Sequence, residues 1–296
     1  MVVVLTTAPQ HVEAVRAAIA ARKHVYCEWP LTISTQRAEK IERLVRDAGI
    51  RHVVGLQRRL APHNRYVRDL LAQGYVGRLR SVRMHVSMNY FQAVLPNALR
   101  WTVPAENFST VVAIYAGHFL DMLFHSVGRP RSLSALMVKQ FPKATIRETG
   151  EVFDKTTPDQ LALVGTLENG AVLSVHIEGG KRNGSGVQID ITGDEGDIRI
   201  NNTSAFGDLG DDYVIEGARG DNIPLQTLDI PAEYNWLPAS DLPSAVLELA
   251  NLYVAFARDL AADTQTAPTF DDAVWMHRLI ELFETSSRTG GTVAVT

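Results

Sequence analysis

The chain contains a single cysteine, Cys27, among its 296 residues. One thiol excludes an internal disulfide and a cysteine-based metal site, and it is typical of a reducing compartment. Formal net charge is −4 and no dense basic run is present, so bulk electrostatics do not indicate nucleic-acid binding. The N-terminal residues lack the basic and apolar regions of a signal peptide, and we find no apolar run long enough to predict a membrane span. We therefore expect a cytoplasmic protein that does not contact membranes.

Two further motifs are missing. The phosphate-binding pattern Gly-x-Gly-x-x-Gly occurs nowhere in the sequence. The histidines do not show the spacing of metal ligands, so we predict no metal site. What the chain does have is an ordinary globular composition, with 46% hydrophobic and 21% charged residues.

Residues 1–77 predict a parallel α/β unit. Short apolar runs at Val2–Leu5, His24–Cys27 and His52–Leu56 indicate strands, and we expect Val2–Leu5 to be buried on both faces. Helical patterns follow each of them, the last at about Pro62–Gln73. Alternating strands and helices indicate βαβ units, and three parallel strands amount to half of a nucleotide-binding Rossmann sheet.

Residues 78–296 predict an α+β domain with a large, mostly antiparallel sheet. Leu79–Tyr90 alternates apolar and polar side chains, and Asn169-Gly170 is a strong hairpin signal. A helix is predicted over Val111–Val127, and Thr203–Asp221, rich in glycine and aspartate, is predicted to be loop. Further strands are expected at Ser132–Val138, Gln160–Leu167, Ala171–Glu178, Val187–Thr192 and Asp197–Ile200, and closing helices at about Ala245–Ala262 and Asp271–Arg288.

Polar and aromatic side chains follow all three predicted parallel strands. Ligands of open parallel sheets bind at the carboxyl ends of the strands, so we expect one nucleotide and substrate cleft there. Tyr90 and Trp101 are candidate rings of the substrate pocket. The residues expected to contact the cofactor are Thr6, Thr7, Pro9, Gln10, His11, Glu28, Trp29, Gln57 and Arg58.

The order Thr-x-Pro-x-x-His, Lys-His-Val-x-x-Glu-x-Pro and Gly-x-Gln-Arg-Arg resembles the glucose-fructose oxidoreductase, inositol dehydrogenase and rhizopine catabolism (Gfo/Idh/MocA) family. The resemblance implies a Rossmann domain, NAD or NADP as cofactor, and sugars or polyols as substrates. It also implies homo-oligomers formed through the sheet of the second domain. The glycine loop and the acidic ribose-binding residue of the family are absent, so we expect the chain to be a truncated form of a longer parent.

Some of the residues that take part in the reaction of the family are replaced in this sequence. The family usually has lysine where Trp29 stands, and aspartate where Ile114 stands, whereas its histidine aligns with His118. Glu-Trp-Pro and the Gly117-His118 pair resemble the Gal80-like branch, which includes dinucleotide-binding regulators of transcription. His118 is thus the candidate general base, with Asp121 beside it in the substrate site and His125 as a competing base.

Three functions follow from this resemblance. The first is an NAD(P)-dependent oxidoreductase that acts on a sugar or polyol hydroxyl. The second is a non-catalytic regulatory protein of the Gal80 type that binds dinucleotide or sugar, which the replacements at Trp29 and Ile114 favour. The third is a remnant that binds no cofactor, because the glycine loop is absent.

Overall fold

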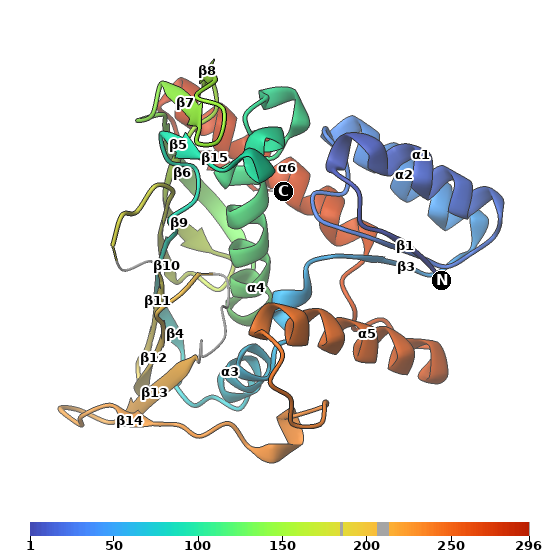
Figure 1. Cartoon of the computed structure of the whole chain (residues 1–296). Helices are drawn as coiled ribbons and strands as arrows, with labels where there is room; N and C mark the ends of the chain where they lie inside the picture. Colours follow the sequence, from blue (N-terminus) through green and yellow to red (C-terminus); the bar gives the residue numbers. More distant parts are fainter. Residues whose placement is uncertain (184–185, 206–212, 296) are drawn as a thin grey trace.

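The computed structural model describes residues 1–183, 186–205 and 213–295. Its first part is a parallel sheet in the order β1-β2-β3 with helices between the strands (Figure 1). The elements are β1 (Val2–Val4), α1 (Ala8–Ala20), β2 (Val25–Cys27), α2 (Thr35–Ala48), β3 (His52–Val54), the 3₁₀ helix η1 (Gln57–Leu60) and α3 (Pro62–Ala72). This confirms the predicted parallel unit.

Helix α2 shows how local sequence sets these bounds. The Ser34 side chain accepts a hydrogen bond from the Arg37 amide and begins the helix. Gly49 ends it in the left-handed conformation, at φ +62°, which glycine adopts without strain.

The small sheet has helices on both faces, but the prediction that Val2–Leu5 is buried on both faces is wrong, because Val3 is 42% exposed and Leu5 is 63% exposed. Helices α1 and α2 lie on one side and α5 (Ser244–Ala262) lies on the other (Figure 1). Leu252 and Phe256 of α5 form one apolar cluster with Tyr26 and Val53 of the sheet. Residues 244–262 therefore pack on the first unit although they lie far along the chain, and a boundary at residue 77 stays a prediction.

The second part is built on a nine-stranded sheet in the order β14-β13-β12-β11-β4-β10-β9-β6-β15. All of its neighbouring strands are antiparallel except β4 and β10, which are parallel. The strands are β4 (Leu79–Ser87), β6 (Pro130–Val138), β9 (Gln160–Leu167), β10 (Val172–Glu178), β11 (Gly186–Gly193), β12 (Gly196–Asn202), β13 (Val214–Arg219), β14 (Gln226–Thr227) and β15 (Val293–Ala294).

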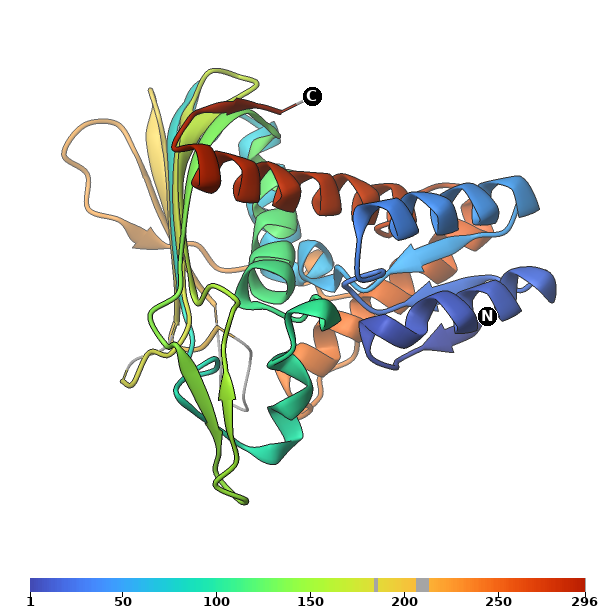
Figure 2. The same cartoon turned by 90° about the horizontal axis from the view of Figure 1, so that it is seen from above.

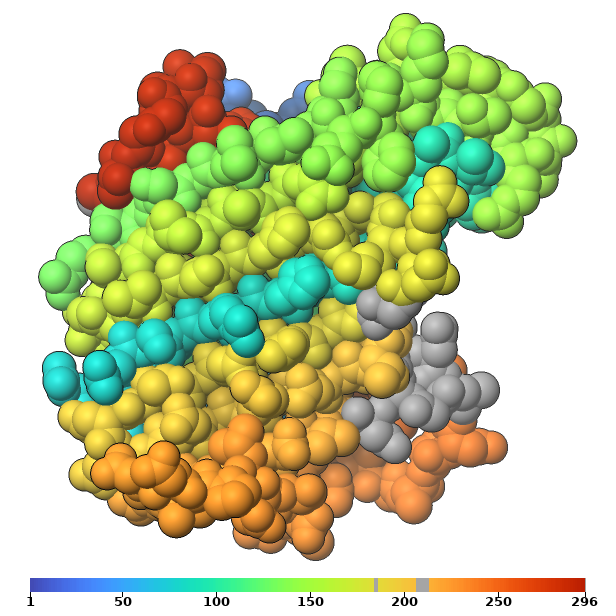
Figure 3. Space-filling model, turned by 90° about the vertical axis from the view of Figure 1, so that its left-hand side faces the viewer, coloured from blue at the N-terminus to red at the C-terminus, as the bar shows by residue number. Residues whose placement is uncertain are grey.

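In the described residues, helices cover one face of this sheet. The π-helix η4 (Val111–Ala116) and α4 (Gly117–Val127) lie against it, and α6 (Phe270–Thr289) runs from there toward α2 (Figure 2). The inward side chains Val82 and Met84 of β4 join the main core. No described helix covers the opposite face, which is seen directly in Figure 3.

A third, small sheet lies beside the large one. It consists of β5 (Val94–Leu95), β7 (Lys143–Ile146) and β8 (Val152–Asp154) in that order. Short 3₁₀ helices complete the described chain at η2 (Asn97–Thr102), η3 (Ala105–Asn107) and η5 (Ala232–Tyr234).

Three expectations need correction. The stretch Ala105–Val127 is long and apolar enough to cross a membrane by length and composition, but 78% of its 18-residue apolar window is buried inside the protein, as in a core helix. The helix predicted over Val111–Val127 is a π-helix followed by an α-helix. Part of the predicted loop at 203–221 is strand β13, which pairs with β12, and residues 206–212 lie outside the described chain.

Candidate functional site

The first strand end is open to solvent. Thr7 precedes α1 in an extended conformation, its side chain caps no amide, and Pro9 occupies the first turn. Thr6, Pro9 and Gln10 are exposed and Thr7 is half-buried. These four residues therefore line an accessible edge, as a cofactor-contacting segment requires.

His11 is buried and its ring is held by backbone groups. Its Nε2 lies 2.7 Å from the Thr6 carbonyl oxygen and its Nδ1 lies 3.0 Å from the Pro30 carbonyl oxygen. The ring therefore ties the end of the first strand to the loop after β2. Its predicted contact with a cofactor stays a prediction.

Glu28 follows β2 and is largely enclosed. A Cβ atom added to Gly55 would lie 2.5 Å from a Glu28 carboxyl oxygen and 2.7 Å from the Tyr26 hydroxyl, so only glycine leaves room for these two groups. Burial raises the pKa of Glu28, and the neighbouring Tyr26 hydroxyl opposes that rise.

Trp29 connects the small sheet to the segment that carries His118. The indole is 5% exposed, and its Nε1 donates a hydrogen bond of 2.7 Å to the Ala113 carbonyl oxygen in η4. A Cβ on Gly117 would lie 2.2 Å from that nitrogen, so the glycine is needed for this close approach. The indole also lies 5.0 Å from the His277 ring of α6, between ring centroids.

Arg58 is an anchored buried cation at the third strand end. Its guanidinium donates to the Tyr213 hydroxyl at 3.1 Å and to the Ala205 carbonyl oxygen at 2.8 Å. It lies 3.6 Å from the Glu248 carboxylate and 4.4 Å above the Phe119 ring centroid. Gln57, the residue before it, is half-buried, and its Oε1 has no hydrogen-bond partner among the described residues.

His118 lies at the start of α4, directly after the glycine that packs on Trp29. The ring is 6% exposed. Burial, and then the nearby Arg58 cation, lower its pKa to about 3. The imidazole is therefore neutral at pH 7 and able to accept a proton.

Asp121 is engaged in a buried ion pair. Arg59 Nε donates to Asp121 Oδ2 at 2.8 Å and its Nη2 contacts Oδ1, while Asp272 on α6 accepts from Nη1 at 3.3 Å. Burial alone would lower the Arg59 pKa, but the two carboxylates raise it above its usual value. The structure thus gives Asp121 a structural partner, and its predicted substrate contact stays a prediction.

The two candidate pocket rings are more exposed than the side chains of this network. Tyr90 is 43% exposed, and its ring centroid is 6.2 Å from that of Tyr115 in η4. Trp101 is 37% exposed in a 3₁₀ helix, and its carbonyl oxygen accepts from Asn107. The structure therefore brings Trp29, Arg58 and His118 to one junction, while Tyr90 and Trp101 are placed nearer the surface.

Sequence reasoning missed the polar groups behind Arg58. A cavity of about 570 Å³ lies there, and none of the residues predicted for the site is among its lining residues. His63 stacks on Tyr213 with ring centroids 3.8 Å apart. The other polar lining groups come from α5 and the segment before it: Asn235, Ser240, Ser244, Glu248 and Asn251. They lie far from η1 along the chain, so no local pattern could have signalled them.

A parallel α/β unit followed by a unit with a large, mostly antiparallel sheet is the fold that the chain shares with an NAD binding oxidoreductase from Klebsiella pneumoniae, at a TM-score of 0.85 and 18% identity. Residues 1–56 match the family described as "Oxidoreductase family, NAD-binding Rossmann fold", and residues 62–202 match "Gal80p, C-terminal domain". The chain is a Gal80-like member of the Gfo/Idh/MocA family.

Curated relatives of two kinds are similar to it. The galactose/lactose metabolism regulatory protein GAL80 of Saccharomyces cerevisiae is 24% identical over 92% of this chain and 72% of its own length. The dehydrogenase aclE of Aspergillus oryzae is 31% identical over 50% of this chain and 40% of its own length. The match to GAL80 of Kluyveromyces lactis spans 49% of that protein. Regulators and dehydrogenases thus both occur among the relatives.

Solved structures show the same fold. The superposition on a super-repressor mutant of Gal80p from S. cerevisiae covers 99% of this chain and 80% of the Gal80p chain, with a TM-score of 0.85 and 23% identity. A levoglucosan dehydrogenase in complex with NADH and levoglucosan covers 99% of this chain and 79% of its own, with a TM-score of 0.85 and 20% identity. The predicted combination of a parallel and a mostly antiparallel sheet is confirmed.

Proposed function

We propose that this chain is an oxidoreductase that binds NAD or NADP and oxidises a hydroxyl group of a sugar or polyol. The observation that supports this most is the position of His118, a neutral buried imidazole beside the fixed Arg58 cation and directly after the glycine that packs on Trp29. Family relatives include dehydrogenases, which is consistent with the proposal.

The residues present fit the nicotinamide end of the cofactor. Gln57 Oε1 is buried without a described hydrogen-bond partner, so it can accept from an amide group. Thr6, Pro9 and Gln10 form an exposed edge after β1, and β2 lies between β1 and the strand that precedes Gln57. The sequence contains no Gly-x-Gly-x-x-Gly for the pyrophosphate, so we expect weak binding by these residues alone.

The residues of this chain would remove the proton of the substrate hydroxyl. A bound nicotinamide supplies the hydride acceptor. A ring nitrogen of His118 takes the hydroxyl proton, and the Arg58 charge favours the alkoxide that develops. A base with a pKa near 3 accepts protons poorly at neutral pH, so we expect slow turnover.

A second candidate function is a regulatory protein that binds the same ligands without turnover. Trp29 stands where the family has lysine, and its indole N–H is committed to the Ala113 carbonyl, so it cannot relay a proton. Asp121 is committed to Arg59. The similarity to GAL80 regulators supports this candidate.

The experiment that separates the two candidates measures binding and turnover on the same preparation. NADH and NADPH are titrated by their fluorescence, and reduction of NAD and NADP at 340 nm is followed with a panel of sugars and polyols. We expect turnover that His118→Gln reduces on the order of 10²–10⁴-fold. His125→Gln, on the same helix, tests the competing base, whose ring lies beside Arg68.

Each outcome assigns a function. Turnover lost in His118→Gln and kept in His125→Gln supports the oxidoreductase. Binding with no turnover on any tested substrate supports the regulatory protein. Absence of both binding and turnover contradicts the two proposals.

We also propose that the chain forms homo-oligomers through the open face of the large sheet. Leu136, Val164 and Val172 are each more than half exposed on strands of that sheet, at 58%, 57% and 57%. Exposed apolar side chains grouped on one face are typical of an interface. Sedimentation analysis of the chain tests this assembly.

A further inference from the structure

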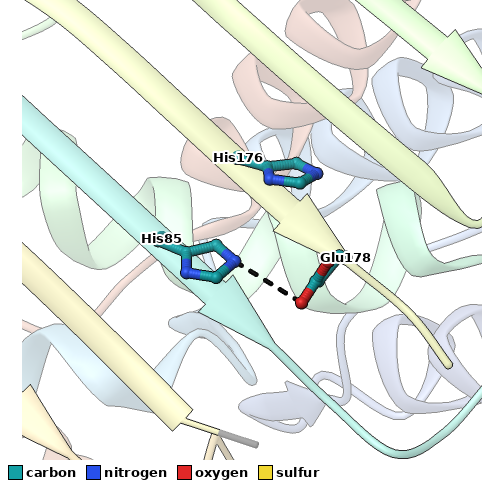
Figure 4. Close-up of side chains that lie close together, drawn as sticks. All are labelled: His85, His176 and Glu178. Carbon is teal, nitrogen blue, oxygen red and sulfur yellow. Dashed lines mark ion pairs between the residues drawn. The ribbon is translucent and has the colours of Figure 1, made fainter. Parts of the chain in front are cut away.

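Two histidines and a glutamate meet on the open face of the large sheet. His85 comes from β4, and His176 and Glu178 come from β10 (Figure 4). Because β4 and β10 pair in register with His176 opposite His85, the two rings lie side by side. Their centroids are 5.3 Å apart and their planes differ by 18°. Neighbouring parallel strands therefore hold the three side chains together, although their spacing along the sequence resembles no metal motif.

The potential ligand atoms lie at a spacing that suits one metal ion. One ligand atom from each of the three residues lies within 4.8 Å of the other two. His85 Nε2 and Glu178 Oε1 are 3.6 Å apart, which is too far for a hydrogen bond. Two ligands on a tetrahedral zinc ion, at about 2.0–2.1 Å from it, lie roughly 3.3 Å apart. Side-chain rotations that shorten spacings of up to 4.8 Å to this value would close the site.

An outer contact fixes the orientation of His176. Its Nε2 lies 3.0 Å from Gln160 Oε1, and Gln160 Nε2 donates to the Gly179 carbonyl oxygen at 3.3 Å. Since the Gln160 amide nitrogen donates to Gly179, the amide oxygen accepts a hydrogen bond from the N–H group at His176 Nε2. That leaves the Nδ1 lone pair of His176 available for a metal, the arrangement found around most histidine ligands.

One cation competes for the carboxylate. Lys181 Nζ lies 2.8 Å from Glu178 Oε1, and its side chain is 39% exposed. A partly exposed ion pair of this kind contributes little to stability, so a divalent ion can displace it. A hollow of about 370 Å³, lined by His85 and Lys181 among others, gives access to the site.

We propose that His85, His176 and Glu178 form a binding site for a divalent cation of the zinc class. Two imidazoles and one carboxylate are ligands that suit zinc. Three protein ligands leave a fourth position for water or for a group of another molecule. This site lies on the face of the sheet opposite His118, so it is separate from the proposed oxidoreductase site and does not depend on it.

The test is a zinc titration of the full chain after chelator treatment and dialysis, in competition with a chromophoric chelator. We expect one tight site per chain. Co²⁺ in place of Zn²⁺ is expected to give the visible absorption of a four-coordinate ion. His85→Ala and Glu178→Gln should each abolish the tight site. Gln160→Ala should weaken it on the order of 10–100-fold, because only the outer contact is lost.

Two further variants separate a built site from unspecific surface binding. Lys181→Ala removes the competing ammonium and should tighten zinc binding. Asp190→Asn is the matched control, because that carboxylate lies on β11 and is already paired with Arg83 and Arg199. Zinc binding that is absent, or that survives in the His85→Ala and Glu178→Gln variants, overturns the proposal. Circular dichroism of each variant checks that it is folded.

Discussion

Replacing Asp121 by asparagine tests whether this residue serves the fold or the substrate. The substitution keeps the shape of the side chain and removes its charge. In the structure Arg59 holds the carboxylate through two guanidinium contacts, at 2.8 Å for the Nε–Oδ2 pair. The Asp121 and Arg59 side chains are only 3% and 10% exposed. Asparagine would leave the guanidinium buried with half of its counter-charge.

The expected loss of stability follows from this burial. Removing one member of a buried ion pair costs about 3–5 kcal/mol, because the other charge stays buried without a partner. Asp272 remains 3.2 Å from Arg59 Nη2 and compensates part of the charge. We therefore expect the free energy of unfolding to fall by about 3 kcal/mol, at the lower end of that range.

Urea unfolding at pH 7, followed by circular dichroism, measures this change. The matched control is Glu39→Gln, whose carboxylate pairs with Arg278 at 2.7 Å on a surface where the arginine is 60% exposed. That control should cost less than about 1 kcal/mol. If Asp121→Asn unfolds within about 0.5 kcal/mol of the unsubstituted chain, the structural role argued for this residue is wrong. Loss of sugar binding in such a stable variant would instead support the substrate contact predicted from the sequence.

Two more predictions concern the junction around Trp29. Burial lowers the pKa of His277 to about 3. Below pH 6.5 the unfolded chain therefore binds a proton at this residue that the folded chain does not bind, and the free energy of unfolding decreases as the pH decreases. We expect His277→Phe to lessen the loss of stability between pH 7 and pH 5 by about 2 kcal/mol in urea unfolding, and an unchanged loss would contradict this. Gly117→Ala should destabilise the fold by about 1–3 kcal/mol, because the new Cβ lies 2.2 Å from the indole nitrogen. Gly291→Ala, with its nearest atom 3.6 Å away, is the control, and equal unfolding midpoints for the two variants would refute the packing argument.

Much of the fold could be predicted because periodicity is a local property. Strand β9 was predicted with the bounds it has, and Asn169-Gly170 does join it to β10, with Gly170 at φ +87°. Strand β13 was missed because glycine and aspartate suggested a loop, whereas pairing with β12 gives Val214–Arg219 its hydrogen bonds. Tertiary pairing overrides local preference there, as it often does in sheets.

The site was harder to predict because its contacts join distant segments. Ligands of parallel sheets bind at the carboxyl ends of the strands, and this principle placed Trp29 and Arg58 in the candidate site. In the structure both residues lie close to the start of α4. The principle could not show that the Trp29 indole bonds to Ala113, or that Arg58 faces Glu248 of α5. The second partner depends on the position of α5 against the first unit, and hydrophobic periodicity in the sequence does not predict that position.

The proposed metal site on the open face was not predicted from the sequence for a related reason. Along the chain His85 is far from the other two candidate ligands, while the parallel β4–β10 pair places it opposite His176. In a parallel pair the strands must be joined by a long connection, so side chains that are neighbours across it are always remote in sequence. Every other neighbouring pair in this sheet is antiparallel. Ligands on the parallel β4–β10 pair are therefore hard to find from motifs of closely spaced residues. The register of the sheet brings them together.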